Sequence, residues 1–157
     1  LEGIARVVVA STNRVMGLYP EDVEVGVEEP PRPDSFYSAS KVAVEALCRN
    51  YVDRFGVSVV CLRIGSFTGK PPPDRRYLRT WVSEADLVRA FERAVVHPDV
   101  SYAVAYACSD NTRLMWRHNG AAIGFSPRDD AERAVADPDA LPPGVPIHGQ
   151  YRDHPGG

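Results

Sequence analysis

The chain has 157 residues, a net charge of -3, and 44% hydrophobic against 25% charged residues, the balance of a folded globular protein. Lysine and arginine are spread along the sequence, so the chain lacks a basic stripe that could bind a nucleic-acid backbone. No apolar run approaches the roughly 20 residues that cross a bilayer, and the first residues lack the features of a secretory signal. We therefore expect a cytoplasmic protein without nucleic-acid or membrane partners.

The first third of the chain predicts a strand, a long loop and a helix. Residues 6–10 (RVVVA) form a β-branched run typical of a buried parallel strand. Residues 16–35 are rich in glycine, proline and acidic residues without periodicity, which predicts a long loop that borders a site. Apolar side chains then recur at helical spacing between residues 37 and 55, and Gly56 ends this predicted amphipathic helix. They are Val44, Leu47, Cys48, Tyr51, Val52 and Phe55.

The rest of the chain continues the alternation of strands and helices. Residues 57–62 (VSVVCL) predict a second buried strand, and strand, helix, strand is the order of an α/β parallel sheet. Ser83, followed three residues later by Asp86, begins a helix predicted over 83–96. A strand over 102–107 and a short helix over 115–123 follow. Beyond residue 136 periodicity vanishes, so we expect a poorly ordered tail over 137–157.

The cysteines and histidines do not form a metal-binding pattern. Cys48, Cys61 and Cys108 lie in apolar stretches far apart in sequence, which predicts buried free thiols. The four histidines are equally scattered, at His97, His118, His148 and His154. We predict no metal site.

Tyr37 and Lys41 place a phenol and an ammonium one helical turn apart, at the start of the predicted helix. A fixed cation near a phenol favours the phenolate, so the pair can act as an acid/base on one bound molecule. The same spacing also occurs on ordinary helix surfaces. The preceding strand ends in Ser11-Thr12-Asn13, and the hydroxyls that this run supplies favour the catalytic interpretation.

The order of strand, hydroxyl, loop, YxxxK helix and strand resembles the extended short-chain dehydrogenases, the NAD-dependent epimerase/dehydratase family. The resemblance implies the carboxy-terminal half of a Rossmann-like doubly wound parallel sheet. It implies that Thr12 orients the substrate hydroxyl, that Tyr37 is the acid/base, and that Lys41 holds the nicotinamide ribose. Tyr37, Lys41 and Ile64 would contact the cofactor, which we expect to be NAD, with NADP also compatible.

Further motifs resemble those of the uronate dehydrogenases within that family. They are Gly17-Leu18-Tyr19, Arg32-Pro33-Asp34-Ser35-Phe36-Tyr37, Leu62-Arg63-Ile64-Gly65-Ser66, Asp74-Arg75-Arg76, Thr80-Trp81-Val82-Ser83 and Ser109-Asp110-Asn111-Thr112. The resemblance implies oxidation of the anomeric hydroxyl of a hexuronic acid to an aldarolactone, in carbohydrate metabolism.

The same resemblance assigns substrate-binding residues. Thr12, Asn13 and Ser66 would orient the sugar acid, and Arg76 would hold its carboxylate, for which a planar guanidinium is suited. Arg14 joins this predicted set at a position where the family has a histidine. Without the resemblance, Arg75 and Arg76 read as a solvated basic turn.

No glycine-rich GxxGxxG turn follows an early strand, so the phosphate-binding half of a dinucleotide site is not expected in this sequence. We expect residues 1–136 to be a partial NAD(P)-binding Rossmann-like domain, inactive alone: a fragment, a truncated product or half of a split enzyme. The alternatives are a sugar-nucleotide epimerase or dehydratase, and a degenerate member that only binds a ligand. The sequence leaves open which uronic acid is used and whether the protein is a homo-oligomer.

Overall fold

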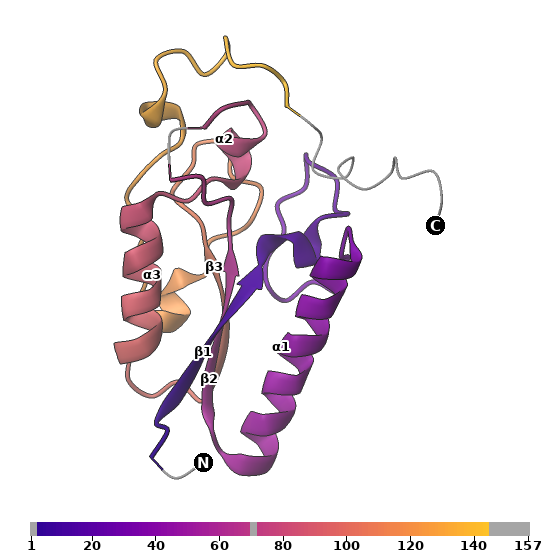
Figure 1. Cartoon of the computed structure of the whole chain (residues 1–157), viewed down its shortest axis with the longest axis vertical. Helices are drawn as coiled ribbons and strands as arrows, with labels where there is room; N and C mark the ends of the chain where they lie inside the picture. Colours follow the sequence, from indigo (N-terminus) through magenta and orange to yellow (C-terminus); the bar gives the residue numbers. More distant parts are fainter. Residues whose placement is uncertain (1–2, 70–71, 145–157) are drawn as a thin grey trace.

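A computed structural model of the chain describes residues 3–69 and 72–144 (Figure 1). Three parallel strands form one sheet in the order β1 (Arg6–Thr12), β2 (Ser58–Ile64) and β3 (Tyr102–Ala107). Helix α1 (Phe36–Phe55) covers one face and α3 (Glu84–Val96) covers the other (Figure 1). The predicted α/β fold class, part of a doubly wound parallel sheet, is confirmed. The short helices are η1 (Asn13–Met16), α2 (Tyr77–Thr80), η2 (Gly120–Ile123) and η3 (Glu132–Ala134).

The strand register places the ends of β1 and β2 side by side. Both strands extend two residues beyond the predicted ends at 10 and 62, because their ladder continues to the pair Thr12↔Ile64. The predicted strand over 102–107 is confirmed. Thr12 is therefore the last residue of a strand rather than part of the following loop. None of the described helices is long and apolar enough to cross a membrane.

The layer between the sheet and α3 is apolar. Alternate residues of β2 and β3 point to this face, as the two-residue period of a strand requires. The buried members are Val60, Leu62, Ala90, Ala94, Ala103, Ala105, Ala107, Ile123 and Phe125. The helix begins where the sequence predicts, because the hydroxyl of Ser83 accepts the backbone N–H of Asp86 at 3.0 Å.

The layer between the sheet and α1 contains a buried ion pair. Glu45 of α1 pairs with Arg63 of β2 at 2.8 Å, and the hydroxyl of Ser11 donates to Glu45 at 2.6 Å. The three residues are 6%, 3% and 3% exposed. Burial by itself lowers the pKa of Arg63, but the hydrogen bonds and charge of Glu45 outweigh it and leave that pKa above its ordinary value. This network joins α1 to both β1 and β2.

The predicted helix over 37–55 is confirmed, but its apolar side is not the buried side. Leu47, Tyr51 and Phe55 are 56%, 44% and 60% exposed. The buried positions of α1 are polar, Ser38 and Glu45. The apolar spacing predicts the helix correctly. The side of α1 that faces the sheet is, however, the side that carries Glu45, which pairs with Arg63. The expectation of a buried apolar stripe is therefore wrong for these three residues.

The short helix predicted over 115–123 is wrong in its first half. Residues around Trp116 are extended and form a parallel bridge with Val25: Val25 donates to the Met115 carbonyl at 3.0 Å, and Arg117 donates to Val25 at 2.9 Å. These backbone groups are therefore not available to a helix. Only Gly120–Ile123 forms a 3-10 turn. The bridge attaches the loop over 16–35, which is irregular as predicted, to the segment after β3.

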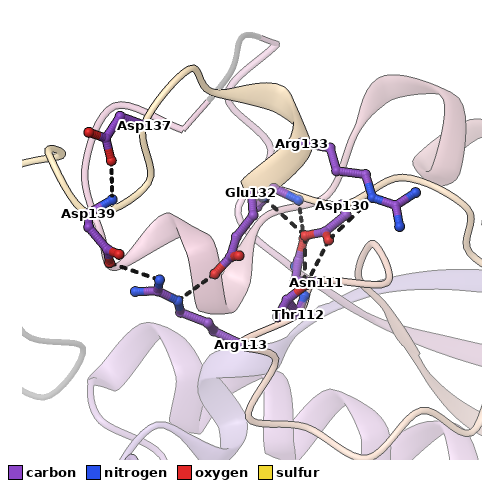
Figure 2. Close-up of polar contacts among 9 residues, drawn as sticks. Asn111, Thr112, Arg113, Asp130, Glu132, Arg133, Asp137 and Asp139 are labelled. Atoms are coloured by element: carbon purple, nitrogen blue, oxygen red, sulfur yellow. Dashed lines mark hydrogen bonds and ion pairs between the residues drawn. The ribbon is translucent and has the colours of Figure 1, made fainter.

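A polar network holds residues 130–139 against the loop that follows β3 (Figure 2). The hydroxyl of Thr112 donates to Asp130 at 2.8 Å, and Arg113 contacts Glu132 and, at 2.9 Å, Asp139. Leu141 packs on a small apolar cluster of Leu78, Trp81 and Ala131. Residues 137–144 of the predicted tail therefore include side chains that contact the rest of the domain. Residues 145–157, including two of the histidines, lie outside the described residues.

Candidate active site

The first turn of α1 carries the predicted acid/base pair. Ser35 caps the helix: its hydroxyl accepts the Ser38 N–H at 3.2 Å, and the Ser38 hydroxyl accepts the Ser35 N–H at 3.0 Å. Tyr37 lies within this capped turn and is 53% exposed. Lys41 lies one turn later, with Nζ 5.6 Å from the centre of the Tyr37 ring, and donates to the Ala10 carbonyl at 2.9 Å. The phenol is thus open to a ligand beside a positioned ammonium.

Thr12 lies at the carboxyl end of β1, the edge where parallel sheets collect their functional residues. Its Oγ1 accepts the backbone N–H of Arg14 at 3.3 Å and so caps η1. The carbonyl that Lys41 binds, that of Ala10, is two residues upstream. The structure brings the predicted hydroxyl and the predicted cation to one end of one strand.

A cavity of about 260 Å³ opens beside this strand end. Its lining residues are Asn13, Arg14, Ser66, Phe67, Arg76, Tyr77, Thr80 and Trp116. Four of the five residues predicted to bind substrate are among them, from η1, the turn after β2 and the start of α2. The fifth, Thr12, immediately precedes the lining residue Asn13. Their roles stay predictions, but their convergence is a property of the fold.

The turn after β2 is joined tightly to α2. Ser66 donates its N–H to the Thr80 carbonyl at 2.6 Å and accepts the Val82 N–H at 3.2 Å, and the Thr80 hydroxyl donates to the Ser66 hydroxyl at 2.8 Å. Gly65 permits this approach, because a Cβ there would stand 2.4 Å from the Thr80 carbonyl. The short α2 thereby brings its residues to the cavity.

Two guanidinium groups line the cavity in different electrostatic settings. Arg14 contacts one oxygen of Asp34 through both Nε and a terminal nitrogen, each at 2.8 Å. Arg76 stacks on the Tyr77 ring at 4.4 Å, and its Nε lies 4.0 Å from Asp74. That Nε is buried and has no hydrogen-bond partner within the described part of the chain.

Four lining residues were not predicted from the sequence. Phe67 and Tyr77 add aromatic walls, and Thr80 adds a hydroxyl. Trp116 is 2% exposed and reaches the cavity because its segment bridges to Val25. Thr80 stands in one of the motifs singled out above, which was a signal for it. Trp116 stood in a segment expected to be helical, so nothing in the sequence pointed to this role.

The residues predicted to contact the cofactor suit a ribose in their chemistry. Lys41 has three N–H donors, and the structure shows one of them on the Ala10 carbonyl. The remaining donors and the exposed phenol of Tyr37 are groups that bind sugar hydroxyls. Ile64 is half-buried at the carboxyl end of β2 and packs against the apolar layer beneath α3. These residues fit the nicotinamide ribose of a dinucleotide.

The predicted burial of the free thiols is confirmed for Cys61 and Cys108 and is wrong for Cys48, and the two buried thiols are not suited to nucleophilic chemistry. Cys61 and Cys108 are buried and Cys48 is partly exposed, and all three are free. Burial, together with the neighbouring Cys48 and Glu45, raises the pKa of Cys61 to about 12, and burial also raises the pKa of Cys108. Thiols of this kind are poor nucleophiles. Among the described residues, no group of three or more His, Cys, Asp or Glu is placed to hold a metal ion.

Comparisons with known proteins show which enzyme families the chain resembles. Residues 1–83, more than half of the chain, match the NAD dependent epimerase/dehydratase family. Uronate dehydrogenase of Pseudomonas syringae pv. tomato is 40% identical over 141 residues, which cover 89% of this chain and 51% of that protein. The L-arabinose 1-dehydrogenase (NAD(P)(+)) of Haloferax volcanii is 39% identical, over 84% of this chain and 62% of that protein.

A solved structure shows the same fold. Uronate dehydrogenase from Agrobacterium tumefaciens superposes with a TM-score of 0.83 at 34% identity, over 96% of this chain and 59% of that structure. The chain spans about half the length of the curated uronate dehydrogenases that it matches. The similarity therefore concerns the half of those proteins that corresponds to β1–β3 and the cavity.

Proposed function

Because the chain belongs to the NAD dependent epimerase/dehydratase family, we propose that it supplies the catalytic and substrate-binding half of an NAD-dependent uronate dehydrogenase. The observation that carries this proposal is the cavity, in which Asn13, Ser66 and Arg76 converge although they lie in three separate segments. In this proposal residues 1–136 form the half-domain, and the reaction converts a hexuronic acid to an aldarolactone.

The lining of the cavity suits a sugar acid. Arg76 offers a guanidinium whose planar fork can bind a carboxylate with two hydrogen bonds. Asn13 and the linked hydroxyls of Ser66 and Thr80 offer neutral donors and acceptors for sugar hydroxyls. The aromatic ring of Tyr77 stacks on the guanidinium of Arg76 and limits its movement.

The proposed proton transfer uses Tyr37. The phenolate of Tyr37 accepts the proton of the anomeric hydroxyl, while Thr12 orients that hydroxyl at the end of β1 and the ammonium of Lys41 stabilises the phenolate. Bound NAD supplies the acceptor for the hydride that leaves the anomeric carbon. Lys41 and Tyr37 would hold its ribose, with Ile64 at the neighbouring strand end. The lost proton and hydride convert the hemiacetal to a lactone.

Arg76 gives the first test of the substrate class. Binding of D-glucuronate and of D-glucose to the 157-residue chain is measured by calorimetry, because the two sugars differ only at the carboxylate. Arg76→Ala should weaken glucuronate binding about thirtyfold to a thousandfold, the equivalent of roughly 2–4 kcal/mol, and leave glucose unchanged. Arg76→Lys should recover only part of the loss. An equal effect on both sugars, or on neither, would show that Arg76 does not bind the carboxylate.

The reaction itself is tested in a fusion of this chain to the amino-terminal half of the 40% identical relative. Formation of NADH from glucuronate is followed in the parent fusion and in Tyr37→Phe, which lacks the proton acceptor. Tyr37→Phe should abolish turnover and retain glucuronate binding. Turnover close to the parent rate in this variant would refute the proposed mechanism.

A further inference from the structure

The cavity holds two potential anion-binding groups. Among the described residues that line it, Arg14 and Arg76 carry charge and none is a carboxylate. If both guanidinium groups were available, the cavity would suit a doubly charged ligand such as a sugar phosphate or an aldaric acid. The charge that the site selects therefore depends on what surrounds each arginine.

The positive charge of Arg14 is compensated by Asp34, which is not among the residues found to line the cavity. The side chain of Asp34 is 1% exposed, and its Oδ2 contacts Nε and a terminal nitrogen of Arg14, each at 2.8 Å. Gly17 leaves the space that this carboxylate occupies, since a Cβ there would stand 2.5 Å from Asp34 Oδ2. An ion pair of this geometry, with its carboxylate buried, neutralises the charge of Arg14 toward the cavity.

The Asp34 carboxylate is also held from the other side. Its Oδ1 accepts the hydroxyls of Ser35 at 3.1 Å and Ser38 at 2.9 Å. These two serines cap α1, so the carboxylate that neutralises Arg14 is fixed to the turn that carries Tyr37. Both oxygens are therefore engaged, and Asp34 cannot turn away from Arg14 without breaking its hydrogen bonds to these two serines.

Within residues 3–69 and 72–144, no carboxylate contacts Arg76 as closely as Asp34 contacts Arg14. Asp74 approaches the Arg76 Nε only to 4.0 Å, because Asp74 Oδ1 accepts the backbone N–H of Arg76 at 3.0 Å instead. The flat face of the Arg76 guanidinium stacks on the Tyr77 ring. This stacking does not use the N–H groups at the edge of the guanidinium. The two arginines thus differ in the charge that they present to a ligand.

We propose that Asp34 determines the charge specificity of the site, because it neutralises Arg14 and leaves Arg76 to bind one carboxylate. This inference rests on the proposed function. The site then selects singly charged sugar acids over both neutral sugars and doubly charged ligands. Asp34 acts through Arg14 and is a specificity-determining residue that need not touch the substrate.

The test compares four ligands that differ in charge: D-glucose, D-glucuronate, galactarate and D-glucose 6-phosphate. Their affinities for the 157-residue chain are measured by calorimetry at pH 7.5. The parent should bind glucuronate more tightly than the other three. Asp34→Asn removes the charge but keeps the shape, and should raise the affinity for galactarate and glucose 6-phosphate about tenfold relative to glucuronate, since Arg14 becomes available to a second anionic group. Asp53→Asn is the matched control, because it makes the same change at an exposed carboxylate of α1 that pairs with Arg49 and does not line the cavity, and it should keep the parent ratios.

A double variant separates the proposed effect from misfolding, because Asp34→Asn alone leaves Arg14 without the Asp34 carboxylate. Arg14→Gln combined with Asp34→Asn removes both charges and should return the ligand ratios to those of the parent. Parent-like ratios in the single Asp34→Asn variant, or a loss of glucuronate binding in the double variant as large as in Arg76→Ala, would overturn the role of Asp34. Failure of the parent chain to bind glucuronate would instead refute the proposed function, and this inference with it.

Discussion

On one face of the sheet, α1 is joined to the strands by a buried carboxylate and a buried guanidinium, whereas on the other face α3 packs through small and branched apolar side chains. Apolar packing is not directional, so it contributes stability with little control over the orientation of a helix. An ion pair with both partners nearly inaccessible fixes orientation, although its desolvation offsets most of its Coulomb energy. The difference matters because α1 carries Tyr37 and Lys41.

The position of Glu45 on α1 supports this division. Lys41 and Glu45 lie one turn apart, and both are bonded to strands: Lys41 to the Ala10 carbonyl and Glu45 to Ser11 and Arg63. Contacts at two successive turns set both the height and the rotation of the helix above β1. The face beneath α1 is thus suited to placing side chains, and the face beneath α3 to holding the domain together.

Removal of Glu45 should destabilise the protein more than any other single change considered for the two faces. Glu45→Ala leaves the guanidinium of Arg63, 3% exposed, without its counter-ion. We expect a loss of about 3–5 kcal/mol in the free energy of unfolding, measured by urea titration, because the buried charge stays uncompensated.

The control replaces both charges with apolar side chains of similar size. Glu45→Leu combined with Arg63→Met should recover most of the lost stability, since the desolvation cost disappears together with the attraction. This double variant should still bind glucuronate less well than the parent, because the orientation of α1 is no longer fixed. Parent-like stability in Glu45→Ala alone would show that the pair does not join α1 to the sheet.

The opposite face should respond differently. Leu62 is fully buried in the layer beneath α3. Leu62→Ala should lower the free energy of unfolding by about 3 kcal/mol, through the lost transfer energy and the cavity that remains. It leaves the contacts of Lys41 and Glu45 intact, so the folded variant should bind glucuronate with parent affinity. A large loss of affinity at unchanged fold would mean that this layer, too, positions the site.

These two faces also explain what could be predicted from the sequence. The apolar layer follows from local patterns: the strand over 102–107 and the Ser83 cap of α3 were both found, because alternation and capping are signals contained in a few residues. The inner face of α1 was not found. Glu45 reads as a surface residue in a helical pattern, since its partner Arg63 lies on another element.

The residues of the site also differ in whether local sequence patterns predict them. Asn13, Ser66 and Arg76 were predicted because they stand in an ordered set of motifs, whereas their meeting in one cavity depends on the parallel register and on the close approach at Gly65. Trp116 was missed because its backbone pairs with Val25, far away in the sequence. No local pattern predicts a bridge between two irregular segments.

The smallest expected effect comes from an ion pair on the same helix that differs from Glu45–Arg63 in exposure. Arg49 and Asp53 lie four residues apart on α1, with contacts of 2.8 Å and 3.0 Å and with side chains 57% and 53% exposed. Asp53→Asn should lower the free energy of unfolding by at most about 0.5 kcal/mol, because water screens the pair and ordering the side chains offsets the attraction.

Salt separates the two pairs further. At 1 M salt the Debye length falls to about 3 Å, so the small effect of Asp53→Asn should vanish when the urea titration is repeated there. The effect of Glu45→Ala should persist, since ions do not reach Arg63. An equal salt response would mean that water enters the layer beneath α1. In that case the ion pair could not fix the orientation of the helix, and the apolar face beneath α3 would be the more rigid of the two.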